Sequence, residues 1–282
     1  MIREIRNTAN FIRTHPLTRS HPVAAAARIL RWQLQSRMQP EIVVPWIAGR
    51  CLAVSRGMTG ATGNIYAGLH EFYDMAFTLH LLRPGDLFAD VGANIGSYTI
   101  LAAGVCGAQS IAFEPDPVTA AKLKHNVELN GLLPLVEIHV AAAGETKGAV
   151  AFTVGRDTEN RVVDCGEGRM VPVETLDSAL GERTPLLIKL DVEGYEQKVL
   201  KGACRLLQDA RLRAVLTEDR STEVVNLLHG AGFSEAAYDA FAHRIVPASQ
   251  ISMANALFIR DDSFVEQRVR SAAAIPVFGQ PV

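Results

Sequence analysis

The chain has 282 residues, of which 48% are hydrophobic and 21% are charged, and this ordinary globular composition excludes a largely disordered protein. No apolar run reaches the roughly 18 residues that a membrane span needs, and charges interrupt the first 16 residues too often for a secretory signal. The four cysteines lie far apart without a CxxC pair, which favours neither a disulfide framework nor a zinc site. We therefore expect a cytoplasmic protein.

Charge is distributed unevenly along the chain. The sequence carries 28 basic and 30 acidic residues, a net charge of −2, yet residues 1–50 hold eight arginines and two glutamates, which leaves −8 for the remainder. This basic segment fits an arm that binds an acidic partner or an anionic surface, or simply a solvated helical face, which we favour.

The first elements are predicted to be helical. Residues 21–38 carry apolar side chains at roughly helical spacing and arginines for the other face, which indicates an amphipathic helix. A short strand is expected at 50–57, and the glycine-rich residues 57–70 are expected to form a loop that covers a ligand. A second helix begins at His70 and ends at the RPGD of residues 83–86.

From residue 86 onward, short strand patterns alternate with helical patterns, which is typical of βαβ units and a parallel sheet. The expected strands are DLFADV, SIAFE, VEIHVAA, LLIKLD, LRAVLTE, and an antiparallel pair GFSEAAYD and ANALFIR. Residues 144–184 interrupt the alternation with polar segments beside the expected active edge of the sheet. Long loops at that edge usually carry substrate contacts, so Asn160 and Arg161 are candidates for holding a polyol, although a solvated hairpin tip fits equally well.

The turn after the first of these strands has a glycine pattern that fails the dinucleotide fingerprint. Counted from Gly92, that fingerprint requires glycine where this chain has Asn94 and Ser97. What remains is Asp-x-Gly-x-Asn-x-Gly, from Asp90 at the strand tip to Gly96 at the start of a helix. The loop allows a ligand to approach the bare backbone, and it is not built for a pyrophosphate.

Two acids indicate which ligand the loop holds. A carboxylate at Asp90 would repel a diphosphate but attract an ammonium or sulfonium group, which favours S-adenosylmethionine. Glu114 ends the next strand, where an acid accepts hydrogen bonds from ribose hydroxyls in both NAD and S-adenosylmethionine sites. The alternative is a tight turn in which both acids cap helices.

A second acidic cluster lies in IKLDVEGYE, at the carboxyl end of a central strand, where open α/β sheets bind ligands. Asp191 is the candidate catalytic partner for an acceptor proton, and Lys189 is expected to pair with a neighbouring acid. The turn at Gly194 is expected to rotate Glu193 away, although Glu193 could also share the work or help Asp191 to seat a divalent metal. A metal is not favoured, and a purely structural ion cluster stays open.

These motifs, together with LRPGDLFADVGANIGSYTILAA, AFEPDP, VETLD and IKLDVEGYEQKVLKGA, resemble the FkbM family of S-adenosylmethionine-dependent methyltransferases over residues 70–220. The resemblance implies a Rossmann-like, doubly wound α/β fold with a seven-stranded, mostly parallel sheet and methyl transfer to a hydroxyl of a sugar, glycan or macrolide. The implied domains are a helical extension with a cover loop at 1–69, the methyltransferase domain at 70–264 and a loosely held tail at 265–282.

The family pattern also implies the cofactor contacts. The methionine-side loop would comprise Asp90, Gly92, Asn94, Ile95, Gly96 and Ser97, and the ribose side would comprise Glu114 and Pro115. Many related enzymes place an acid after the third strand, whereas this chain has alanines at 141–143, so backbone groups near Ala142 are expected to contact adenine. Within the cover loop, Tyr66 is a candidate substrate contact.

Three functions are compatible with the sequence: an O-methyltransferase acting on a small molecule or glycan, an NAD-dependent oxidoreductase, and a binding protein that keeps the cofactor fold without catalysis. The glycine spacing counts against the oxidoreductase. Nucleic acid is not expected as a partner because residues 51–282 are acidic and no Asn/Asp-Pro-Pro-Tyr motif is present. A homo-oligomer stays open.

Overall fold

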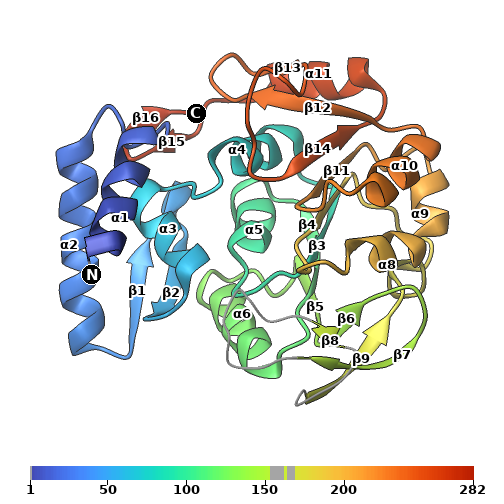
Figure 1. The fold of residues 1–282 in the computed structure, drawn as a ribbon, viewed down its shortest axis with the longest axis horizontal. Coiled ribbons are helices and arrows are strands. Elements are labelled where there is room, and N and C mark those ends of the chain that lie inside the picture. The colour runs from blue at the N-terminus through green and yellow to red at the C-terminus, as the bar shows by residue number, and fades with distance from the viewer. Residues whose placement is uncertain (1, 153–161, 164–168) are drawn as a thin grey trace.

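The computed structural model describes residues 2–152, 162–163 and 169–282. Figure 1 shows a central sheet with helices on both sides and a separate group of N-terminal elements at one side. The predicted substrate contacts Asn160 and Arg161 lie outside the described residues.

The central sheet contains eight strands within the described part of the chain. From edge to edge they are β13 (Arg244–Val246), β12 (Ser234–Asp239), β14 (Ala256–Ile259), β11 (Ala214–Thr217), β10 (Leu187–Leu190), β3 (Leu87–Val91), β4 (Gln109–Phe113) and β5 (Val136–His139). The five strands from β11 to β5 are parallel, and β14 runs antiparallel to both of its neighbours. The mostly parallel α/β fold is confirmed, but the sheet has one strand more than expected because the three-residue β13 extends its edge.

Helices cover both faces of this sheet because its central strands are apolar on both sides. In β3, Phe88 belongs to one buried cluster and Ala89 to another, and Leu187 and Ile188 of β10 alternate in the same way. The helices are α4 (Phe72–Leu81), α5 (Ser97–Ile100) with its π-helical continuation Leu101–Val105, α6 (Pro117–Leu129), α7 (Leu176–Leu180), α8 (Glu196–Lys201), α9 (Cys204–Gln208), α10 (Thr222–Gly230) and α11 (Asp262–Arg270). The resulting core fixes the carboxyl ends of β3, β4, β10 and β11 at one edge.

The N-terminal elements are α1 (Ile2–Thr14), α2 (Pro22–Met38), the hairpin of β1 (Glu41–Pro45) and β2 (Cys51–Ser55) with the short turn Ile47–Gly49 between them, and α3 (Thr59–Ala67). The helix at 21–38 is confirmed, but the loop expected at 57–70 is wrong because α3 is helical. A Cβ at Gly63 would lie 2.2 Å from the His70 Nδ1, so this glycine permits close packing of the helix rather than a flexible loop. The side chain of Asn126 on α6 holds β2 by accepting a hydrogen bond from the Ala53 amide (2.7 Å).

The segment between β5 and β10 builds a second, four-stranded sheet from β6 (Ala142–Ala143), β9 (Arg169–Glu174), β7 (Gly148–Phe152) and β8 (Val162–Val163), in that order. The strand expected through VEIHVAA is therefore divided between the two sheets. This division places Ala142 and Phe152 beside the end of β4, where the candidate site lies.

The expected loose tail at 265–282 is wrong. The helix α11 buries Val265 and Val269, and the strands β15 (Pro276–Val277) and β16 (Gln280–Pro281) form a hairpin after it. Val277 and Val282 are buried, and the Gln280 side chain donates a hydrogen bond to the Leu17 carbonyl (2.8 Å). These contacts hold the C-terminal hairpin, which lies beside the N-terminal elements in Figure 1.

Candidate active site

The loop between β3 and α5 forms the floor of the site, and left-handed backbone conformations shape it. Gly92, Asn94 and Gly96 have φ values of 84°, 50° and 92°, which glycine adopts freely and asparagine tolerates better than most residues. A Cβ at Gly92 would lie 1.8 Å from the Asp191 carbonyl oxygen, so no side chain fits there. The glycine spacing therefore serves a close contact between the ends of β3 and β10.

Glu114 braces this loop from the end of β4. Its two carboxylate oxygens accept hydrogen bonds from the backbone amides of Asn94 (3.0 Å) and Asp116 (2.9 Å). Burial raises the pKa of Glu114 to about 7, against the opposing effect of these hydrogen bonds. Each oxygen keeps a further lone pair for a ligand hydroxyl, since a carboxylate has about four acceptor sites.

A pocket opens beside Glu114, and we call it the Glu114 pocket. Its lining includes five of the predicted cofactor contacts, Gly92, Asn94, Glu114, Pro115 and Ala142, with the neighbouring Ala141 and Ala143. Its further walls, which sequence reasoning missed, are Phe113, Thr119, Phe152, Val192 and Tyr195, and the predicted catalytic residues Asp191 and Glu193 close it. The pocket thus combines apolar walls with one buried carboxylate.

A second cavity of about 350 Å³ adjoins the first, and we call it the Asp90 pocket. Asp90 is buried on β3 and accepts a hydrogen bond from the Thr99 hydroxyl through Oδ2 (2.6 Å), while its Oδ1 has no hydrogen-bond partner among the described residues. Burial raises the pKa of Asp90, and the nearby Lys189 ammonium opposes that rise. An unsatisfied buried acceptor is costly, so this oxygen indicates a place for a cationic or hydrogen-donating ligand group.

Lys189 and Asp191 form a buried ion pair at the end of β10. The Lys189 ammonium donates to Asp191 Oδ2 (2.6 Å) and lies 4.6 Å from the centroid of the Tyr98 ring. Burial alone would lower the pKa of Lys189, but the negative charges of Asp191, Glu71 and Asp90 together raise it above its usual value. Lys189 therefore stays protonated, and the expectation that it pairs with a neighbouring acid is confirmed.

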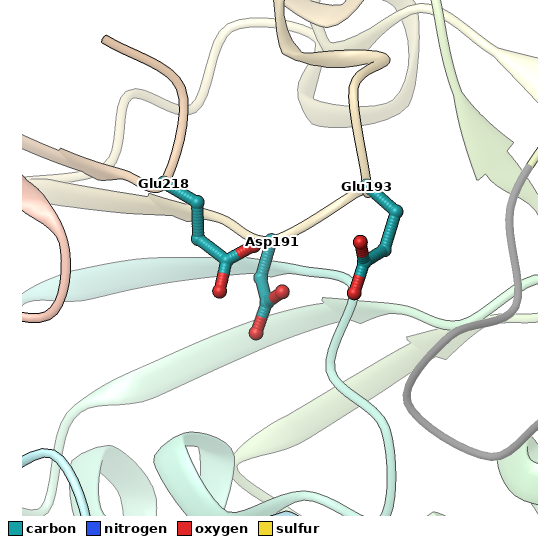
Figure 2. A group of neighbouring side chains, drawn as sticks. All are labelled: Asp191, Glu193 and Glu218. Carbon is teal, nitrogen blue, oxygen red and sulfur yellow. The ribbon is translucent and has the colours of Figure 1, made fainter.

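Three carboxylates meet at the mouth of the Asp90 pocket (Figure 2). Asp191, Glu193 and Glu218 each place an oxygen within 4.8 Å of the others. Glu193 has φ +50°, and this turn keeps it beside Asp191, so the expectation that the turn rotates it away is wrong. Partial burial and the charge of Asp191 raise the pKa of Glu218 to about 7, although its side chain remains open to solvent.

Sequence reasoning missed Glu218 although a signal was present. The residue follows β11 directly, and β11 pairs in parallel with β10 so that Thr217 lies opposite Leu190. Acids that end neighbouring parallel strands meet at the same edge of a sheet. The acid after LRAVLT was therefore recognisable as a partner of Asp191.

The N-terminal elements complete the Asp90 pocket. From the N-terminal side, the pocket is lined by Gly60, Ala61 and Asn64 of α3 and by His70, Glu71 and Met75. From the glycine loop, it is lined by the predicted residues Ile95 and Ser97 and by Ala93 and Tyr98. Tyr66 is not among the lining residues. The turn of α3 directs the Tyr66 side chain away from the cavity, and its hydroxyl accepts a hydrogen bond from Gln33 of α2 (3.4 Å). Asn64 faces the cavity instead and donates to the Ser97 hydroxyl (3.1 Å). The structure therefore does not support Tyr66 as a substrate contact.

None of the described helices is long and apolar enough to cross a membrane.

Comparison with known proteins identifies the family. The model of the methyltransferase FkbM domain matches residues 90–234, just over half of the chain, from Asp90 to the start of β12. The chain belongs to the FkbM methyltransferase family. It is 30% identical over 209 residues to the 31-O-demethyl-FK506 methyltransferase FkbM of Streptomyces tacrolimicus, covering 58% of this chain and 79% of that one.

Two further proteins are similar. Methyltransferase 1 of Beauveria bassiana is 29% identical over 159 residues, which cover 46% of this chain and 64% of that protein. The crystal structure of methyltransferase FkbM from Methylobacillus flagellatus is 17% identical, with a TM-score of 0.44, and the match covers 84% of this chain and 60% of the other. The family assignment makes this FkbM-family protein a methyltransferase.

Proposed function

We propose that this FkbM-family protein transfers a methyl group from S-adenosylmethionine to a hydroxyl of a saccharide, glycan or related natural product. The observation that carries the proposal is the buried Asp90 Oδ1, which has no partner among the described residues, on a side chain that lines a cavity sharing Gly92 and Asn94 with the Glu114 pocket. When bound, the cofactor supplies a methyl group on a positively charged sulfur. The two pockets offer one acid for each polar part of this cofactor: Asp90 for its cationic end and Glu114 for its ribose.

The residues present fit this cofactor in both pockets. In the Asp90 pocket, Asp90 would accept from the amino acid ammonium, and Ser97 at the start of α5 would bind the carboxylate end, since helix N-termini favour anions. In the Glu114 pocket, Glu114 would accept from ribose hydroxyls, and the apolar walls formed by Ala142 and Phe152 would hold adenine.

The acid cluster would hold the acceptor hydroxyl. A displacement at carbon requires the attacking oxygen to lie in line about 3 to 3.5 Å from the methyl carbon, and it requires a group that takes the hydroxyl proton. Because Lys189 already donates to Asp191 Oδ2, we assign Asp191 to orienting the hydroxyl. Glu218 would take the proton, since its pKa of about 7 suits a base at neutral pH and its exposed position lets the proton reach solvent.

The same three carboxylates offer the oxygen atoms that a hard cation prefers, so a metal needs separate consideration. The Lys189 ammonium already supplies a positive charge 2.6 Å from Asp191 Oδ2. A fixed cation at this position would repel a second one. Our proposal therefore assigns no metal to the reaction.

Two features support a hydroxyl acceptor. The name of the Streptomyces relative describes methylation of an oxygen on a natural product. The mouth of the Asp90 pocket, with Glu71, Glu193 and Glu218, offers acceptors for several hydroxyl groups.

The proposal is tested with S-adenosylmethionine labelled in its methyl group and a panel of methyl glycosides, oligosaccharides and 31-O-demethyl-FK506, with amino sugars and uronic acids as amine and carboxylate acceptors. We expect label in at least one hydroxyl compound, as a methyl ether that survives mild base. Label in an amine or carboxylate compound alone would contradict O-methylation. Donor binding without transfer to any acceptor would favour the non-catalytic alternative.

A further inference from the structure

The outer face of α2 presents an apolar stripe that the rest of the described chain leaves uncovered. Val23, Leu30, Leu34 and Met38 are 83%, 62%, 57% and 83% exposed, and Ala27 between them is exposed as well. At about 100° per residue, these five positions fall within roughly 80° of the helix surface. Figure 1 shows α2 at the outer left edge of the molecule.

Arginines flank the stripe on both sides. Arg37 precedes it and Arg31 follows it around the helix, both exposed, and α2 contains no acidic residue. Behind Arg31 lies a groove of about 230 Å³ between α2 and β1, lined by apolar side chains that include Trp32, Ile42 and Trp46. An apolar centre between cationic side chains can use both contacts that an anionic lipid surface offers, acyl chains for the apolar side chains and phosphates for the arginines.

We propose that α2 docks this protein on an anionic lipid surface, with Val23, Leu30, Leu34 and Met38 inserted among the acyl chains and Arg31 and Arg37 at the phosphates. Arginine can extend its guanidinium to the headgroups while its methylenes stay with the apolar stripe. The net charge of +6 over residues 1–50, against −8 for the remainder, adds a general attraction of the N-terminal segment to negative charge.

The charge of α2 also favours a lipid surface over two other partners, a second copy of this chain and a nucleic acid. In a two-fold contact through this face, the α2 helices of the two copies would lie against each other. Arginines would then meet arginines, and α2 has no acid to pair with them. A nucleic acid backbone would satisfy the arginines but would leave the apolar stripe against phosphates and water. A lipid surface satisfies both features at once.

The test is co-sedimentation of the full chain with extruded vesicles of phosphatidylcholine or of equimolar phosphatidylcholine and phosphatidylglycerol. We expect binding to the anionic vesicles, weaker binding to the neutral ones, and release by salt. The double variant Leu30→Gln and Leu34→Gln should bind about tenfold more weakly or worse. The affinity of the double variant Arg31→Gln and Arg37→Gln for anionic vesicles should fall roughly thirtyfold, because each arginine contributes a factor of about five or slightly more.

The matched control variants replace exposed apolar and arginine side chains outside α2. Val118→Gln with Leu133→Gln removes two apolar side chains that are 60% and 54% exposed, and Arg211→Gln with Arg270→Gln removes two arginines of similar exposure. Both controls should sediment like the unaltered protein. Glutamine is as good a helix former as leucine or arginine, so the α2 variants should fold, which circular dichroism would verify.

Three results would overturn the proposal. The first is an absence of binding to anionic vesicles at low salt, and the second is equal binding by the α2 variants and their controls. The third is that vesicles bind none of the proteins, while the unaltered protein dimerises in light scattering or binds polyuridylate and the α2 variants do neither. Methyl transfer does not enter this assay, so its outcome is independent of the proposed activity.

Discussion

The Glu114 pocket and the Asp90 pocket share the residues Gly92, Asn94, Asp191 and Glu193, but they are built in different ways. The Glu114 pocket has apolar walls and a single buried carboxylate whose oxygens already hold backbone amides. The Asp90 pocket gathers carboxylates from the ends of β3, β10 and β11 and from the start of α4, with Lys189 as their counter-ion.

This difference separates binding from chemistry. Backbone geometry and a braced acid prepare the Glu114 pocket to hold one ligand without rearrangement. Side chains with raised pKa values and partial solvent access equip the Asp90 pocket for moving a proton. The following experiments disturb one pocket, the other, or their junction.

The largest effect is expected at the junction, from Gly92→Ala. The new Cβ would overlap the Asp191 carbonyl oxygen, and alanine would also be strained at φ +84°. We expect the free energy of unfolding to fall by about 4 kcal/mol or more, with loss of S-adenosylhomocysteine binding. Urea denaturation and calorimetry measure both quantities. Gly148→Ala is the control, because nothing lies within 4 Å of its Cβ, and it should change neither.

The second effect isolates the proton acceptor. Glu218→Gln should lower the rate of methyl transfer about a hundredfold or more, since it removes the base, while affinity for S-adenosylhomocysteine stays unchanged. In the unaltered protein the rate should rise as pH passes through about 7, where Glu218 loses its proton, and the variant should lose this rise. Glu223→Gln, an exposed acid on α10, serves as the control. A pH profile that survives in Glu218→Gln would contradict the assignment.

The third effect concerns the Glu114 pocket alone. Burial raises the pKa of Glu114 to about 7, and only the ionised form accepts on both oxygens, so affinity for S-adenosylhomocysteine should increase about tenfold between pH 6 and pH 8. Glu114→Gln should bind more weakly and lose this pH dependence in calorimetry. In the free protein the same shift lowers stability as pH rises from about 5 to about 7, because the unfolded chain releases this proton first.

The smallest effect is expected from metal removal. Because Lys189 supplies the positive charge beside Asp191, dialysis against EDTA should leave the rate of methyl transfer unchanged. A rate that disappears with EDTA and returns with Mg²⁺ would instead place a cation among Asp191, Glu193 and Glu218.

Prediction from the sequence succeeded where neighbouring residues determine the structure. The glycine loop and the Lys189–Asp191 pair each come from one short segment, where strand alternation and turn chemistry act locally. Phe152 could not be placed as easily, because its position depends on the second sheet, and Glu218 is recognisable only once β10 and β11 are known to pair in parallel.

The errors in the fold have a similar origin. The glycines of α3 indicate a loop in isolation, but packing of Gly63 against His70 makes a helix favourable. The C-terminal residues lack a strong local pattern, and their order comes from Val277 and Val282 entering the core and from Gln280 bonding to Leu17. Tertiary contacts, which a local pattern does not contain, decide both segments.

Calorimetric titration of the unaltered protein with S-adenosylhomocysteine and, separately, with NAD decides which cofactor the two pockets hold. We expect saturable binding of S-adenosylhomocysteine at one site, weakened in Asp90→Asn and in Glu114→Gln, and no binding of NAD. Binding of NAD in place of S-adenosylhomocysteine, or S-adenosylhomocysteine binding that neither substitution weakens, would contradict this expectation.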